Sequence, residues 1–117
     1  MQTQLYGIKN CDTVKKARKW FETRGLDYRF HDFREEGLQQ TQVQRWLDQV
    51  GVDVLVNRRS TTWKQLDDAE KEKALTRDGV DVLLQHPTLI KRPVICMGDR
   101  VHVGFQEATF QSVWDEV

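Results

Sequence analysis

Apolar positions along the first third of the chain change from an alternating pattern to a helical one and back again. The segment 2–8 alternates in the manner of a strand, and apolar residues in 12–24 recur at helical spacing before Gly25. The aromatic-rich segment 27–33 is typical of a second strand. A strand, a helix and a strand in this order predict a parallel strand pair joined by a right-handed crossover.

The middle of the chain keeps helical spacing. Apolar residues form a stripe over 38–50, and shorter helices are predicted over 66–75 and 79–85. Pro87 ends this region, because proline cannot continue a helix. The pattern therefore predicts a helical insertion over about 38–86.

The last part of the chain returns to strands. We predict strands over 92–97 and 100–103, joined by a turn at Gly98-Asp99 and paired as an antiparallel hairpin. A final helix is predicted from the apolar stripe Phe110, Val113, Trp114 and Val117. The whole order, βαβ…ββα, predicts an α/β fold with a four-stranded mixed sheet, helices on both faces of the sheet, and a helical insertion between strands 2 and 3.

Composition narrows the class of protein. The 117 residues suit one domain, and 18 basic residues balance 18 acidic ones, so no charge footprint points to direct nucleic-acid binding. No apolar stretch has the length of a membrane span, and the first four residues lack the features of a secretory signal. Two cysteines in unlike contexts indicate a reducing compartment. We expect a cytoplasmic monomer that does not bind a membrane.

Cys11 is the strongest chemical candidate. It falls where the first strand gives way to the first helix, and free N–H groups at the start of a helix favour a thiolate. A neighbouring carboxylate at Asp12 opposes that ionisation unless it points to solvent. The alternative is a small apolar residue at a helix start, with Asn10, Asp12 or Thr13 serving as caps.

The residue three places after Cys11 is Val14, so the segment is not a Cys-x-x-Cys motif. An intramolecular disulfide across it is therefore impossible. If Cys11 forms a covalent adduct during catalysis, an external thiol must resolve that adduct. Glutathione is the natural cytosolic candidate.

The second thiol and the histidines offer less. Cys96 lies in an apolar strand and is expected to pack in the core, the alternative being a resolving thiol for Cys11. The three histidines, His31, His86 and His102, show no ligand spacing with one another or with the cysteines. We therefore expect no metal site.

Four segments together resemble one known family. They are Tyr6–Thr13 (YGIKNCDT), Arg59-Ser60 followed by Trp63–Leu66 (WKQL), His86–Val94 (HPTLIKRPV) and Val103–Phe105 (VGF). Their order and spacing resemble the ArsC/Spx family of thioredoxin-fold proteins, and within it the small YffB-type members. The resemblance implies a single ArsC-like domain over 1–117, with a thioredoxin-like core at about 1–34 and 88–117 and the insertion at about 38–86.

The resemblance also implies a set of site residues. Cys11 corresponds to the nucleophile, and Arg92 to a catalytic arginine that contacts an oxyanion or substrate beside the thiolate. Pro93 corresponds to the cis-proline of the thioredoxin fold, which lies against the nucleophile and lines the substrate site. Asn10, beside Cys11 in the matched segment, is expected among the substrate-binding residues.

Two further arginines are expected to bind substrate. Arg59 fits the second anion contact of the family, with Arg58 beside it, although an ungapped alignment would place Asn57 at that position. Arsenate reductases of the family carry a third arginine after the final hairpin, where this chain has Val103-Gly104-Phe105. Two guanidinium groups would hold arsenate less well than three.

The function that these features imply is a single-cysteine, glutathione-dependent thiol–disulfide oxidoreductase. Glutathione would be a co-substrate, and no bound cofactor is expected. Arsenate reduction is a less supported variant. The alternative is a non-catalytic regulator of the Spx type that binds RNA polymerase, although those regulators sense oxidation through the Cys-x-x-Cys motif that Val14 removes here.

Overall fold

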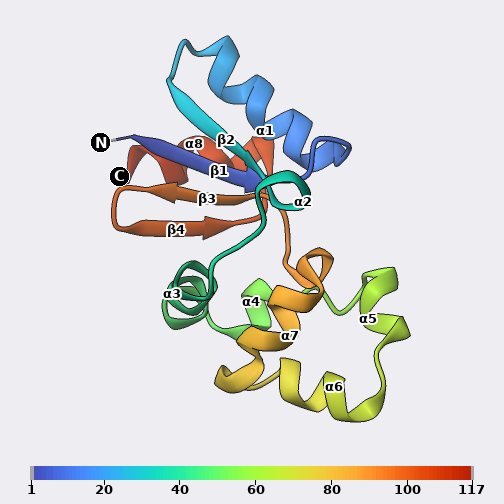
Figure 1. Cartoon of the computed structure of the whole chain (residues 1–117). Helices are drawn as coiled ribbons and strands as arrows, with labels where there is room; N and C mark the ends of the chain where they lie inside the picture. The colour runs from blue at the N-terminus through green and yellow to red at the C-terminus, as the bar shows by residue number, and fades with distance from the viewer. Residues whose placement is uncertain (1, 117) are drawn as a thin grey trace. The chain divides into compact units, whose positions relative to one another are not determined.

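The computed structural model describes residues 2–116, and the chain divides into two compact units (Figure 1). The first unit comprises Met1–Glu36 and Arg92–Val117, and the second comprises Gly37–Lys91. That the two units form one ArsC-like domain stays a prediction.

A four-stranded mixed sheet forms the centre of the first unit. Its strands are β1 (Thr3–Gly7), β2 (Tyr28–Asp32), β3 (Val94–Met97) and β4 (Arg100–Val103), in the order β2-β1-β3-β4. β1 pairs with β2 in parallel, whereas β1–β3 and β3–β4 are antiparallel. The predicted sheet is therefore confirmed, with its parallel βαβ unit and its closing hairpin.

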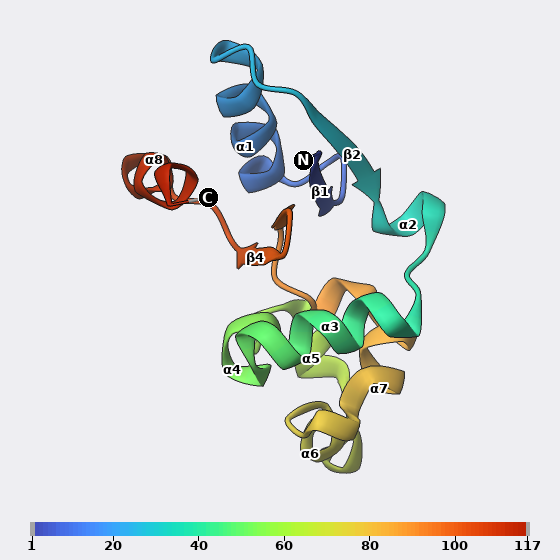
Figure 2. The same ribbon diagram turned by 90° about the vertical axis from the view of Figure 1, so that its left-hand side faces the viewer.

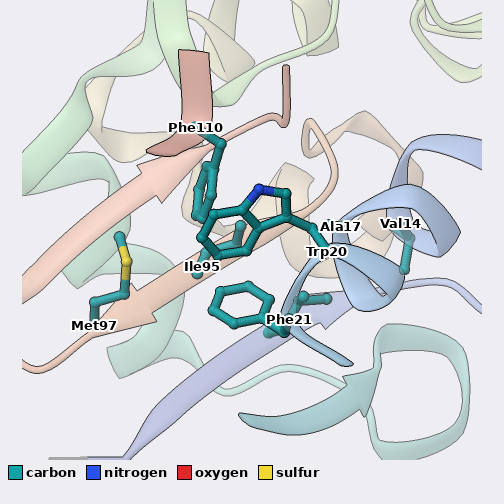
Figure 3. Close-up of a cluster of buried hydrophobic side chains, with 8 residues drawn as sticks. Val14, Ala17, Trp20, Phe21, Ile95, Met97 and Phe110 are labelled. Atoms are coloured by element: carbon teal, nitrogen blue, oxygen red, sulfur yellow. The ribbon is translucent and has the colours of Figure 1, made fainter. Parts of the chain in front are cut away.

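Two helices, α1 (Asp12–Thr23) and α8 (Glu107–Asp115), pack on the same face of this sheet and not on opposite faces as predicted (Figure 2). Leu5 and Ile95 are register partners on neighbouring strands and turn toward these helices. Figure 3 shows the resulting core of eight buried residues: Leu5, Val14, Ala17, Trp20, Phe21, Ile95, Met97 and Phe110. Val117, the last residue of the predicted stripe, lies outside the described residues.

The first helix ends where the sequence predicts. Gly25 has a φ of +66°, a conformation that glycine adopts at no steric cost, and its N–H donates to Glu22 O (3.2 Å). The Leu26 N–H donates to Phe21 O (3.0 Å). These two bonds form a Schellman cap, which returns the chain toward β2.

The second unit is helical, as predicted for the insertion. It contains α3 (Gln40–Val50), α4 (Val52–Leu55), α5 (Thr61–Gln65), α6 (Asp68–Ala74), α7 (Val80–Gln85) and the 3₁₀ turns η1 (Arg77–Gly79) and η2 (Pro87–Leu89). The short helices α4 and α5 were not predicted. Four or five residues span little more than one turn and show no repeat in the sequence.

Some predicted element ends are wrong, for local reasons. The second strand stops at Asp32, because that carboxylate caps the short helix α2 (Phe33–Glu36). The predicted helix 66–75 begins only at Asp68, because the Asp67 side chain accepts the Glu70 N–H (2.8 Å) as its cap.

Among residues 2–116, no helix is both long enough and apolar enough to cross a bilayer.

Candidate active site

Cys11 lies at the N-cap of α1, as the sequence predicts. Its N–H donates to Ile8 O (3.2 Å) and closes a turn, and its carbonyl oxygen accepts the first helical hydrogen bond, from Lys15 N (3.0 Å). The cysteine is partly buried and packs against the core of the first unit, whereas Asp12 is exposed. Cys11 therefore begins α1 through its backbone, without a side-chain hydrogen bond to the first turn, and the Asp12 side chain faces solvent.

Close packing between Gly7 and Val14 fixes where α1 starts. A Cβ added to Gly7 would lie 2.6 Å from Val14 Cγ2, so only glycine lets the first turn of α1 lie this close to the end of β1. Val14 is fully buried. The residue in place of a second cysteine therefore serves as a packing residue.

Asp32, which the hydrophobic pattern does not single out, joins two segments beside Cys11. The Asp32 side chain, in a residue only 5% exposed, accepts the Lys9 N–H (3.0 Å), the Arg34 N–H (2.8 Å) and the Glu35 N–H (3.3 Å). Burial alone would raise the pKa of Asp32, but these three backbone donors outweigh burial and hold it below the ordinary 3.8. The sequence signal that could have revealed it is the capping spacing Asp32-x-x-Glu35.

Arg92 and Pro93 lie directly before β3. Their peptide bond is cis, as the family resemblance implies. Pro93 is buried and Arg92 is partly buried. The carbonyl oxygen of Pro93 accepts the Gly104 N–H (2.8 Å), and Gly104 has a φ of +85° that favours glycine.

The sheet register brings these residues to the same end of the first unit as Cys11. Tyr6, near the end of β1, pairs with Val94, the first residue of β3. Cys11 follows the end of β1 by four residues, and Pro93 directly precedes Val94. Asp32 reaches this end as well, because it pairs with Gly7.

Asn10 lies in the turn before Cys11 and is exposed. Its side chain is therefore accessible to solvent, and its role in substrate binding stays a prediction.

In place of the third arginine of arsenate reductases, the chain has Val103-Gly104-Phe105. Gly104 binds the Pro93 carbonyl, and Phe105 packs against the core and lies 5.2 Å from Phe110 between ring centroids. This segment supplies backbone support and apolar packing, and it contains no cation.

Arg58 and Arg59 lie in a turn of the second unit. The Asn57 side chain accepts the Arg59 N–H (3.0 Å), and Ser60 Oγ donates to Asn57 O (2.9 Å) and caps α5. Arg58 pairs with Asp53 (2.9 Å), and both side chains are largely exposed.

These arginines line a cavity of about 490 Å³, whose described lining residues are Asp53, Val56, Asn57, Arg58, Arg59 and Lys91. An antiparallel bridge between Val56 and Ile90 brings Lys91 to the cavity, together with a hydrogen bond from Lys91 N to Leu55 O (2.8 Å). Sequence reasoning missed Lys91, because nothing in the sequence signals this bridge.

Two further groups of the first unit are Cys96 and His102. Cys96 lies between Ile95 and Met97, so strand alternation turns its side chain to the face opposite α1. Burial, assisted by the charge of Arg100, lowers the pKa of His102 below 6.5. Across the part of the chain that the structure describes, no group of three or more His, Cys, Asp or Glu residues could hold a metal ion.

Comparison with known proteins agrees with this architecture. A protein of Haemophilus influenzae with the name "Uncharacterized protein" is 44% identical over 110 residues, covering 94% of this chain and 96% of its own. The global transcriptional regulator Spx 2 of Oceanobacillus iheyensis is 28% identical, covering 92% of this chain and 79% of its own. A solved structure of the YFFB (PA3664) protein is 38% identical with a TM-score of 0.87, covering 94% of this chain and 96% of its own.

These similarities confirm the thioredoxin-like α/β fold with its arsenate reductase-like arrangement of elements. The model of the ArsC family matches residues 6–113. Since that match spans nearly the whole sequence, this chain belongs to the ArsC family.

Proposed function

We propose that this chain is a single-cysteine thiol–disulfide oxidoreductase that uses glutathione, with Cys11 as its nucleophile. The observation that carries the proposal is the position of Cys11 at the N-cap of α1, at the end of the sheet where Arg92 and Pro93 lead into β3. Val14 offers no second sulfur, so the resolving thiol comes from outside the chain.

The proposed reaction has two exchange steps. The Cys11 thiolate attacks the glutathione sulfur of a glutathione mixed disulfide, forms a disulfide to glutathione and expels the substrate thiolate, which takes up a proton. A second glutathione, as its thiolate, attacks the glutathione sulfur of this adduct. Oxidised glutathione leaves, and the Cys11 thiolate is regenerated. One substrate disulfide is reduced, and two glutathione units end as one disulfide.

Arginines would supply the binding groups. The Arg92 guanidinium, partly buried beside Pro93, is proposed to hold a glutathione carboxylate. The backbone before Pro93 would pair with the extended peptide in the manner of an added strand. Arg59 and Arg58 of the second unit remain proposed substrate-binding residues, because exposed guanidinium groups around a cavity suit a carboxylate.

Arsenate reduction is a weaker variant of the same chemistry. The segment Val103–Phe105 provides packing where a third guanidinium would be needed to complete an arsenate cradle.

The proposal is tested by glutathione-dependent reduction of hydroxyethyl disulfide, with arsenate as a second substrate. Cys11→Ser is expected to abolish turnover, and the matched variant Cys96→Ser to retain it, because Cys96 lies on the other face of the sheet. Unchanged turnover in Cys11→Ser would overturn the assignment of the nucleophile.

The similarity to Spx regulators supports a second candidate, a non-catalytic module that binds RNA polymerase. A polymerase pull-down separates the two functions. Retention of the protein on polymerase, unaffected by Cys11→Ser and accompanied by no thiol turnover, would favour the regulator.

A further inference from the structure

We propose that Asp32 is a positioning residue for the Cys11 thiol, because its carboxylate bonds the turn that carries Cys11 to the start of α2. This inference rests on the proposed role of Cys11 as nucleophile. The Asp32 side chain is buried and touches backbone donors, so it acts through Lys9 and contacts no substrate.

The two oxygens of the carboxylate serve two different segments. Asp32 Oδ1 accepts from the Arg34 and Glu35 N–H groups and caps α2, whereas Oδ2 accepts the Lys9 N–H, 23 residues away in sequence. A cap needs only one oxygen. The Oδ2 bond therefore ties the turn before α1 to a separate element.

The hydrogen bond from Lys9 to Asp32 Oδ2 lies inside the turn that ends at Cys11. Lys9 stands between Ile8 and Cys11, whose own hydrogen bond closes this turn (Cys11 N to Ile8 O, 3.2 Å). The register pair Gly7–Asp32 brings the end of β2 beside the start of the turn. Loss of the Oδ2 bond would leave the Lys9 N–H without this partner and loosen the two residues that lead to the thiol.

The three donors keep Asp32 ionised over the pH range in which a thiol reductase works, because they hold its pKa below the ordinary value despite burial. Both oxygens therefore remain acceptors. The ion pair between Lys9 and Glu35 (2.8 Å) also joins the two segments, but both side chains are mostly exposed and such pairs contribute little.

The rival explanation is that Asp32 only caps α2, and two substitutions separate the explanations. Asp32→Ser retains a good helix cap but is too short to serve Lys9, whereas Asp32→Ala removes both functions. Glu35→Gln is the matched control, since it removes the exposed ion pair and leaves the buried carboxylate in place.

The experiment measures kcat and KM for hydroxyethyl disulfide reduction, together with amide hydrogen exchange at Lys9. If Asp32 positions the thiol, both Asp32→Ser and Asp32→Ala lower kcat about tenfold or more with little change in KM, because a misplacement of about 1 Å can cost on the order of 100-fold in rate. Exchange at the Lys9 amide is expected to accelerate in both variants, and Glu35→Gln is expected to behave as the unsubstituted protein.

Wild-type kcat in a folded Asp32→Ser variant would overturn the positioning role and leave only the cap. If Asp32→Ser does not fold, Asp32→Asn replaces it, because its single amide oxygen cannot serve both segments. Retention by Asp32→Asn of both kcat and slow Lys9 exchange would then contradict the proposal. Turnover that survives Cys11→Ser would instead refute the proposed function, so the two failures are distinguishable.

Discussion

Two short turns carry the predicted chemistry of this chain, and they are built differently. The turn 8–11 is fixed by buried groups: Asp32 accepts its Lys9 N–H, and Gly7 lets α1 begin close against β1. The turn 57–60 is held by hydrogen bonds among its own groups and by one from the Asn57 N–H to Leu89 O (2.7 Å), and both of its arginines are exposed.

The difference suits the two proposed roles. A nucleophile has a short side chain and must be placed to within a fraction of an ångström, so the backbone around Cys11 has to be fixed. A guanidinium on a long side chain can adjust to a carboxylate. We therefore expect substitutions that disturb the Cys11 turn to reduce activity more than substitutions that disturb the Arg58-Arg59 turn.

The largest effect is expected from Gly7→Ala. The new methyl group would meet Val14 Cγ2 at 2.6 Å, and such overpacking costs about 1–3 kcal/mol of unfolding free energy. The displaced α1 should also slow alkylation of Cys11. Urea unfolding and iodoacetamide kinetics measure both effects, with Cys96→Ser as the background so that only Cys11 reacts.

The double variant Gly7→Ala/Val14→Ala is the control for this contact. Removal of the Val14 methyl groups should restore the rate of Cys11 alkylation, although the smaller core residue lowers stability. A Gly7→Ala protein with unchanged stability and reactivity would show that the close contact does not position the thiol.

The next largest effects are expected on the KM for glutathione, in the variants Arg92→Ala and Arg59→Ala. Loss of the partly buried Arg92 is expected to raise the KM for glutathione about tenfold, as for a charge-assisted hydrogen bond worth about 1.5 kcal/mol. Loss of the exposed Arg59 is expected to raise it only about two- to fivefold. Steady-state kinetics with glutathione as the varied substrate measure both, and a larger effect from Arg59 would reverse the comparison.

Acid is expected to weaken the first unit in two stages. The first involves His102, whose pKa is lowered by burial and then by Arg100, so the unfolded chain takes up a proton near pH 6.5 before the folded chain does. The unfolding free energy should therefore fall as the pH drops from about 6.5 through the lower folded pKa. In urea titrations, His102→Gln should reduce the change of the unfolding free energy with pH over this range. An unchanged pH dependence in His102→Gln would exclude His102 as its source.

The second stage belongs to Asp32. Its folded pKa lies below 3.8, so its contribution is fully present above the pKa of the unfolded chain and is lost as the pH falls through the folded value. The same titrations, continued to more acidic pH, should show a loss that Asp32→Asn lacks.

The smallest effect is expected from Arg58→Ala. Its ion pair with Asp53 joins side chains that are 51% and 86% exposed, so the unfolding free energy should change by less than about 0.5 kcal/mol. Thermal unfolding at low and high salt measures this change. A larger loss would mean that the Arg58-Arg59 turn depends on the pair.

The site is predictable from sequence only where its signal is local. The place of Cys11 follows from the change of hydrophobic period around it, and Arg92-Pro93 follows from the family resemblance. Asp32 was missed because the aromatic run through Phe33 predicts a continuous strand and obscures the capping signal. Lys91 could not be found, because the bridge between Val56 and Ile90 is a contact between distant segments.

The most direct test of the central claim is to trap the intermediate. The protein is incubated with oxidised glutathione in the absence of reduced thiol, and adducts are located by peptide mass spectrometry. We predict one glutathione adduct, on Cys11, with Cys96 unmodified, and its release on addition of reduced glutathione. A folded protein that forms no adduct, or forms one on Cys96 alone, would contradict the assignment of Cys11 as the nucleophile.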